Sequence, residues 1–250
     1  MYKSMCMFAI GVFVFIGSIA KANAGDYLLP EIKGLSISGD TAIYSQFLSR
    51  GFLRDSDPVT QTGVYAKYKD IKLGVWGSGD MANRDTRKSN RVFYLADFTH
   101  KINKISFSLG YDYLDYVGVN ARGQEAYIGI GADVFLSPSF TWFYGWGDAS
   151  ANNNGGTDYG VLSLAHSIPL GKTPVSLDLS GHIAYNRKYY IKGSSGGDAL
   201  LTVGLKFPLT KNLTIKPNVD YAMPLGDVRA KNDGMQKNKF YGGANLSYSF

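Results

Sequence analysis

The last twelve residues of the chain, KFYGGANLSYSF over 239–250, point most directly to its fold. Successive side chains of a β-strand point to opposite faces, so every second residue of this stretch shares a face. The residues of that face are Phe240, Gly242, Ala244, Leu246, Tyr248 and Phe250. Polar residues fill most of the positions between them. The alternation predicts a strand with one apolar side, and the last residue of that side is a phenylalanine at the chain end.

The same period-two alternation recurs through the rest of the chain. Aliphatic and aromatic residues alternate there with small, hydroxylated and charged ones, so each segment has an apolar and a polar face. The clearest of these segments are 105–113, 125–134, 175–183, 201–207 and 213–221. A soluble β-sandwich also alternates in this way, so alternation alone leaves two fold classes open.

The connections between the segments favour a membrane barrel. Short ones fall at 69–70, 101–104, 136–139, 169–174 and 208–212, and long polar ones at 50–57, 79–90, 116–123, 148–157, 187–197 and 225–238. Short turns at one end and long loops at the other are typical of outer-membrane barrels, whose strands need roughly 9–11 residues. Aromatic residues collect near the strand ends, as expected at headgroup level: Tyr111, Tyr113, Tyr116, Trp142, Tyr144, Trp146, Tyr185, Tyr189 and Tyr190.

These features predict an all-β fold, a single closed antiparallel transmembrane β-barrel of about twelve strands, an even number as such barrels require. Ten or fourteen strands remain open. The predicted strands are 35–47, 59–68, 71–79, 91–100, 105–116, 124–135, 139–147, 158–168, 174–186, 198–208, 213–224 and 239–250. The turns would be periplasmic and the long loops extracellular. Tyr248 and Phe250 match the terminal pattern that the barrel-assembly machinery of Gram-negative bacteria recognises, so that machinery is an expected partner.

The N-terminus has the three parts of a secretory signal peptide. Lys3 gives a positive start, 5–20 is apolar, and Ala22-Asn23-Ala24 provides small residues for cleavage. The alternative, a membrane-anchoring helix, needs about 20 apolar residues, and Lys21 closes the run before that. We therefore expect a cleaved signal over 1–24, export through the general secretory pathway, and an integral outer-membrane barrel over 25–250.

The composition excludes several classes of protein. The single cysteine, Cys6, lies in the predicted signal, so the mature chain has no disulfide and no thiol ligand. Mean hydropathy is only −0.11 despite 18 Tyr and 14 Phe, which suits apolar surface interrupted at every second residue. The net charge of +6 falls to +4 once Lys3 and Lys21 are removed. Such a mild excess on a secreted chain gives no reason to expect a nucleic-acid partner.

The first half of the predicted barrel resembles a known family. Ser49-Arg50-Gly51, then 58–65 (PVTQTGVY), then 74–78 (GVWGS), and the tyrosine-rich 111–116 after a glycine are similar to the TorF-like porins. These are proteobacterial outer-membrane barrels, mostly without an assigned substrate. The resemblance implies a porin and brings no ligand or catalytic residue. Phe52-Leu53 follows Arg50-Gly51 here, where the family commonly has a Ser/Thr-Gln step.

The polar faces of the predicted strands carry the candidate pore lining. The residues are Asp97, Asp112, Glu125, Asp133, Asp178, His182, Lys206, Lys216 and Asp220. In a pore these charges set ion preference. In a plugged barrel they pair across the interior, and a barrel of about twelve strands lies between the filled and the open sizes. We expect a narrow porin for passive diffusion of small hydrophilic or ionic solutes.

The predicted long loops carry basic residues. These are Arg84, Arg87, Lys88, Arg187, Lys188, Arg229 and Lys231. On the outer face, Arg and Lys can pair with lipopolysaccharide phosphates or attract anionic solutes. The alternative function is therefore a non-conducting interaction barrel whose loops bind lipopolysaccharide or another surface partner. Ordinary solvated loops would look the same in sequence.

The sequence gives little support for catalysis. Its histidines are His100, His166 and His182, and only His182 is predicted to lie mid-strand on a polar face. A barrel lipid-modifying enzyme needs a nucleophile, a base and an orienting group together, so this hypothesis rests on His182 alone. The scattered histidines do not have metal-site spacing. We expect no enzyme activity, metal or cofactor, and the sequence leaves the oligomeric state open.

Overall fold

The computed structural model describes residues 32–82, 90–117, 121–147, 156–189, 191, 195–230 and 236–249. The predicted signal peptide, 1–24, and the terminal Phe250 lie outside the described residues. No helix among the described residues is long and apolar enough to cross a membrane.

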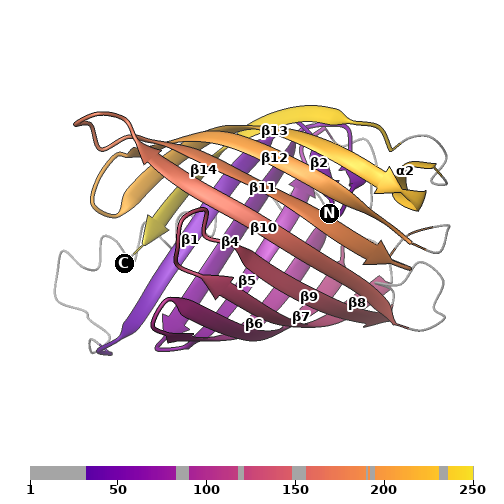
Figure 1. The fold of residues 1–250 in the computed structure, drawn as a ribbon, viewed down its shortest axis with the longest axis horizontal. Helices are drawn as coiled ribbons and strands as arrows, with labels where there is room; N and C mark the ends of the chain where they lie inside the picture. The colour runs from indigo at the N-terminus through magenta and orange to yellow at the C-terminus, as the bar shows by residue number, and fades with distance from the viewer. Residues whose placement is uncertain are drawn as a thin grey trace.

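Twelve antiparallel strands close into a barrel (Figure 1). They are β1 (Leu35–Tyr44), β4 (Val59–Tyr68), β5 (Ile71–Asp80), β6 (Arg91–Ile102), β7 (Ile105–Tyr116), β8 (Ala121–Ala132), β9 (Ser139–Gly147), β10 (Thr157–Pro169), β11 (Ser176–Arg187), β12 (Gly196–Pro208), β13 (Leu213–Gly226) and β14 (Lys239–Ser249). Neighbours in sequence pair in the sheet, and β1 closes the barrel on β14 in a register from Ser38↔Ser249 to Tyr44↔Gly243. The predicted fold class and the count of twelve are confirmed.

The alternation in sequence becomes an inside and an outside. Large apolar side chains face outward and stay exposed, for example Leu109, Ile128 and Val219. Buried polar and charged side chains occupy the opposite face of the same strands, as Glu125 and Asp220 do. A soluble protein would bury the first set and expose the second, so this inverted distribution fits a barrel surrounded by lipid.

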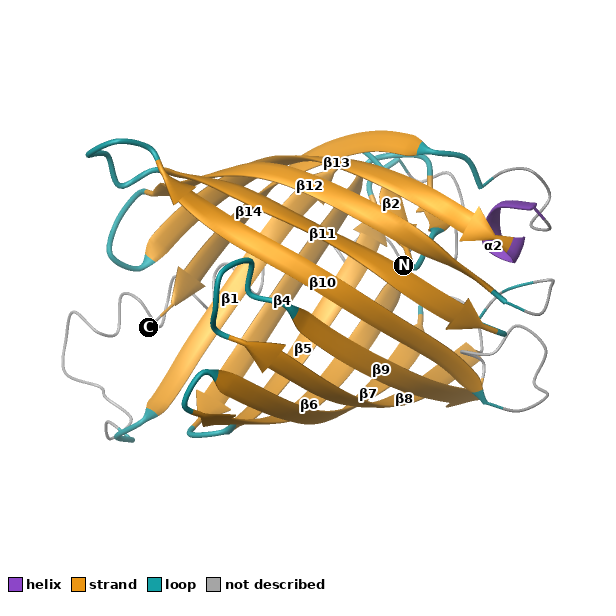
Figure 2. Ribbon diagram, viewed as in Figure 1, coloured by secondary structure: helices purple, strands orange, loops and turns teal. Residues whose placement is uncertain are grey.

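The two ends of the barrel differ. Connections at one end are tight, such as Lys69-Asp70 between β4 and β5, where Lys69 has a φ of 53°. The short helix α2 (Asp227–Ala230) lies at the opposite end, after β13 (Figure 2). We call these the short-turn end and the long-loop end. The N-terminus of β1 and the C-terminus of β14 both lie at the short-turn end.

One segment departs from the prediction. The sequence favoured a first strand over 35–47 and a polar loop over 50–57. In the structure β1 ends at Tyr44, and β2 (Phe47–Ser49) pairs with β3 (Phe52–Asp55) as a separate two-stranded sheet. We call residues 45–58 the inner hairpin. Its contacts show that it folds into the barrel.

Candidate functional site: the lumen and its inner hairpin

The inner hairpin turns through Arg50 and Gly51. Ser49 pairs with Phe52, so the loop has two residues, with φ angles of 54° and 78°. Two positive φ angles define the tight turn that suits a hairpin best, and glycine takes the second position without strain. A Cβ on Gly51 would lie 2.9 Å from the Cβ of Asp198 and 3.2 Å from Val228 Cγ1. The turn therefore packs so closely against β12 and α2 that a side chain at Gly51 would clash with them.

The Arg50 side chain contacts strands that lie across the barrel from β1 and β4. Its guanidinium donates two hydrogen bonds to Glu125 of β8, at 2.5 Å to Oε1 and 2.7 Å to Oε2. Three rings surround it: Phe143 of β9, Tyr159 of β10 and Tyr189 after β11 lie 4.9, 4.6 and 4.3 Å from its Cζ atom. We call these five residues the Arg50 latch.

The latch is buried and charged. Glu125 is 1% exposed, and Tyr159 and Tyr189 are buried beside it. Burial disfavours the guanidinium charge, but the Glu125 carboxylate outweighs it and raises the pKa of Arg50. A bidentate pair has fixed geometry as well as charge, and removing one partner leaves a buried charge uncompensated. The latch thus fixes the tip of the inner hairpin to the far wall.

Two further contacts hold the inner hairpin. Phe47 packs against Trp76 of β5, with ring centroids 6.3 Å apart, and beneath the guanidinium of Arg91 of β6 at 4.6 Å. On the other strand, the Leu53 N–H donates to Gln236 Oε1 at 2.8 Å, in the segment before β14. The first strand, the turn and the second strand of the inner hairpin are therefore each attached to a different part of the protein.

A hydrogen-bond network continues from the latch to His182. The Tyr159 hydroxyl donates to Asp198 Oδ1 at 3.1 Å, and His182 Nε2 lies 2.8 Å from Asp198 Oδ2. Asp198 itself is buried. These partners account for His182 as a structural member of the network, and no group of three or more His, Cys, Asp or Glu among the described residues could hold a metal ion.

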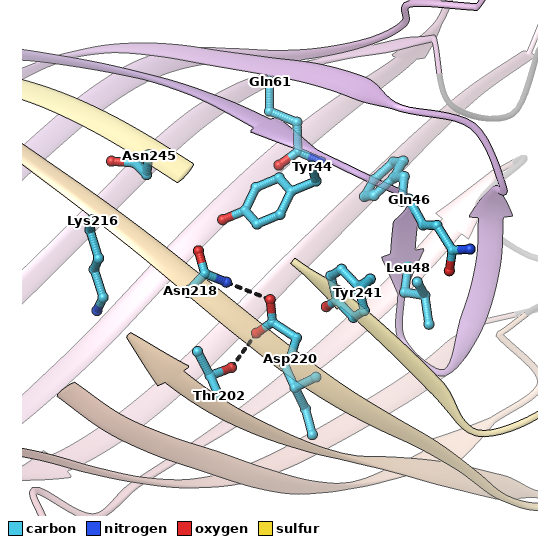
Figure 3. Close-up of a pocket in the computed structure, with 12 residues that line it drawn as sticks. Tyr44, Gln46, Leu48, Gln61, Thr202, Lys216, Asn218, Asp220, Tyr241 and Asn245 are labelled. Carbon is cyan, nitrogen blue, oxygen red and sulfur yellow. Dashed lines mark hydrogen bonds between the residues drawn. The ribbon is translucent and has the colours of Figure 1, made fainter. Parts of the chain in front are cut away.

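The inner hairpin leaves a cavity of about 380 Å³ on its other side. The lining residues come from the inner hairpin and from β1, β4 and β12 to β14: Tyr44, Gln46, Phe47, Leu48, Gln61, Leu200, Thr202, Lys216, Asn218, Asp220, Tyr241 and Asn245. Figure 3 shows Tyr44, Gln61 and Asn218 converging on the space from different strands. Three inward residues of β13, Lys216 to Asp220, span roughly 13 Å along it. We call this side the cavity half of the lumen and the side of the Arg50 latch the latch half.

Most of the predicted pore-lining residues fall into these two groups. In the latch half, Asp112 lies opposite Glu125 in register, and Tyr127 donates to Asp97 at 2.9 Å. In the cavity half, Lys216 Nζ lies 2.9 Å from Asp178 Oδ2.

Asp220 of the cavity half accepts hydrogen bonds from Thr202 and Asn218, each at 2.5 Å. Two further candidates lie near the short-turn end. Lys206 is exposed, level with Ser176. Asp133 lies one residue beyond β8, exposed and 2.7 Å from Lys101, whose hydrogen bond lowers the pKa of Asp133. The structure thus places Asp133 at a rim, apart from the rest.

The predicted basic rim is only partly described. Arg187 ends β11 and forms an ion pair with Asp158, while Lys188 and Arg229 are exposed at the long-loop end. Arg84, Arg87, Lys88 and Lys231 lie outside the described residues. Tyr248 belongs to β14, on its outward face, and Phe250 is not described.

Sequence reasoning missed the inner hairpin as a functional element. Arg50 and Gly51 were noted only for the family resemblance, and Gln61, Asn218 and Tyr241 were not singled out. A pattern for the hairpin was present: Phe47-Leu48-Ser49 and Phe52-Leu53 flank a two-residue step ending in glycine, which is typical of a β-hairpin.

Comparisons with known proteins agree with this architecture. No known protein family and no curated protein matches the sequence. Among solved structures, an outer-membrane channel from Pseudomonas putida F1 aligns with a TM-score of 0.55 at 11% identity, over 90% of this chain and 98% of its own. The NanC porin gives 0.53 at 11% identity and the KdgM porin 0.52 at 13%, each over 86% of this chain and 98% and 99% of theirs. At these identities the likeness is one of fold.

Proposed function

We propose that the chain is an outer-membrane porin through which small hydrophilic solutes diffuse passively, with the inner hairpin as its constriction. One observation carries this proposal: a cavity with polar and charged lining groups lies beside a hairpin that is fixed across the lumen. The hairpin narrows the barrel but leaves the cavity half lined by amide, hydroxyl and charged groups. Such groups can replace part of the hydration shell of a passing solute.

The test is single-channel recording of refolded 25–250 in a planar bilayer with a KCl gradient. Discrete current steps are the expected result, because the cavity half offers polar groups to passing ions and water. A folded barrel that never conducts would overturn the proposal. Heat-modified gel mobility is a suitable check that the barrel has folded before recording.

The resemblance around Arg50-Gly51 gains a physical meaning in this proposal. The step that the chain shares with the TorF-like porins is the turn of the inner hairpin, so we infer that the chain belongs with that group. We also propose the processing that the N-terminus predicts: a signal peptide over 1–24, export through the general secretory pathway, and assembly guided by Tyr248 and Phe250.

The alternative function is a barrel that does not conduct and binds through its long-loop end. Exposed Lys188 and Arg229 favour it, because both lie where lipopolysaccharide phosphates would meet the protein. Retention of the protein by immobilised lipopolysaccharide, abolished in Lys188→Ala/Arg229→Ala, together with a silent bilayer recording, would support this alternative over the porin.

A further inference from the structure

We propose that the cavity half selects uncharged polyhydroxylated solutes of about monosaccharide size and binds them in passing. The inference rests on the proposed porin function and names the solute class of the same lumen. It is drawn from the chemistry of the cavity lining, from the partners that its charged groups have in the wall and from its size.

The lining combines aromatic rings with free hydrogen-bonding groups. The rings of Tyr44 and Tyr241 lie side by side, with centroids 6.3 Å apart. Among the described residues, none hydrogen-bonds the hydroxyls of these two tyrosines or the amide of Gln61. A pyranose has apolar C–H faces and a rim of hydroxyls that both donate and accept, and phenol and amide groups offer the matching donors and acceptors.

Both charged groups of the cavity have partners within the wall. Lys216 pairs with Asp178, and Asp220 accepts hydrogen bonds from Thr202 and Asn218. An ionic solute would have to lose water here and compete with the partners that these charged groups already have in the wall, which is unfavourable. A neutral solute loses only hydrogen bonds to water, which the free tyrosine and Gln61 groups can replace.

The size and position of the cavity agree with a small ligand. A volume of about 380 Å³ lies near the lower end of the 300–1,000 Å³ typical of small-molecule sites. Gln46 and Leu48 of the inner hairpin form one side of it, opposite the barrel wall (Figure 3). A solute passing the constriction must therefore contact both the hairpin and the strands.

The experiment compares three probes of one shape and different charge. D-glucose, D-glucuronate and D-glucosamine are added in turn to single channels conducting KCl, and the half-saturating concentration for current interruption is measured. The proposal predicts that glucose acts at a concentration at least about tenfold lower than either charged sugar. Equal potency of the three sugars, or preference for a charged one, would overturn it.

Variants place the effect in the cavity. Gln61→Ala and Tyr241→Phe each remove a free hydrogen-bonding group and should raise the half-saturating glucose concentration several-fold. The matched controls are Gln124→Ala of β8 and Tyr94→Phe of β6, two residues that do not line the cavity, which should not change it. A cavity variant that folds and conducts but binds glucose as the controls do would contradict the assignment.

The outcomes separate this inference from the proposed function. Absence of KCl current in a folded barrel removes the porin proposal and this inference with it. KCl current without preferential interruption by glucose leaves the porin in place and removes only the inference.

Discussion

The two halves of the lumen are built from the same kind of strand but are filled differently. In the latch half, a bidentate Arg50–Glu125 pair enclosed by Phe143, Tyr159 and Tyr189 joins the inner hairpin to the wall. In the cavity half, the polar groups bond along the wall and leave about 380 Å³ empty. The inner hairpin thus contacts the wall directly on one side and borders a cavity on the other.

Removal of the inner hairpin should have the largest effect. Replacing 46–57 by a short Gly-Ser linker removes the partition and merges the two halves, so we expect single-channel conductance to increase several-fold. Current steps of the wild-type size in a deletion variant that has folded would show that the hairpin does not lie in the conducting path.

Loss of the Arg50–Glu125 ion pair in the Arg50 latch should have the next largest effect. Glu125→Gln leaves the buried guanidinium without its counter-charge, and loss of a buried partner costs about 3 kcal/mol. We expect a less stable barrel in urea titration and larger, noisier current steps as the hairpin tip moves. Asp112→Asn, which removes the carboxylate facing Glu125 in register, is the control and should change both properties less.

The reciprocal exchange Arg50→Glu/Glu125→Arg tests whether the pair itself holds the hairpin. We expect the current steps of this double variant to be less noisy than those of Glu125→Gln and to approach the wild-type noise level. Noise equal to or above that of Glu125→Gln alone would argue that packing of the rings, and not the ion pair, fixes the tip.

Gly51→Ala should have a smaller effect. A positive φ costs an alanine about 1 kcal/mol, and its Cβ would lie 2.9 Å from Asp198. We expect a modest loss of stability together with noisier current steps. Gly171→Ala is a suitable control, because Gly171 has a φ of 65° with nothing within 4 Å. It should lose stability without a change in noise.

A change of charge in the cavity half should have the smallest effect. Lys216→Gln leaves Asp178 without its cation, so the reversal potential in a KCl gradient should shift by a few millivolts towards that expected for cation preference. Lys206→Gln, an exposed residue near the short-turn end, should shift it less. An equal shift in both variants would mean that bulk surface charge, and not the cavity, sets ion preference.

Most strands were predictable because they follow a local rule, whereas 91–100 and 158–168 alternate poorly in sequence. Alternation identifies the faces, and the contrast between Lys69-Asp70 and the long loops identifies the two ends. The inner hairpin could not be predicted, because its position depends on contacts between residues far apart in sequence, such as Arg50 with Glu125. Alternation also groups Asp133 with Glu125, yet the strand ends at Ala132 and leaves Asp133 at a rim.

The most direct test of the asymmetric lumen uses the absence of cysteine from 25–250. Single cysteines are introduced at Asn218 in the cavity half and at Thr157, a buried residue beside Glu125, in the latch half. A charged methanethiosulfonate reagent is then added to conducting channels. We predict that the current falls in Asn218→Cys and is unchanged in Thr157→Cys. Equal block at both positions, or block at Thr157→Cys alone, would contradict a lumen that is closed on one side and open on the other.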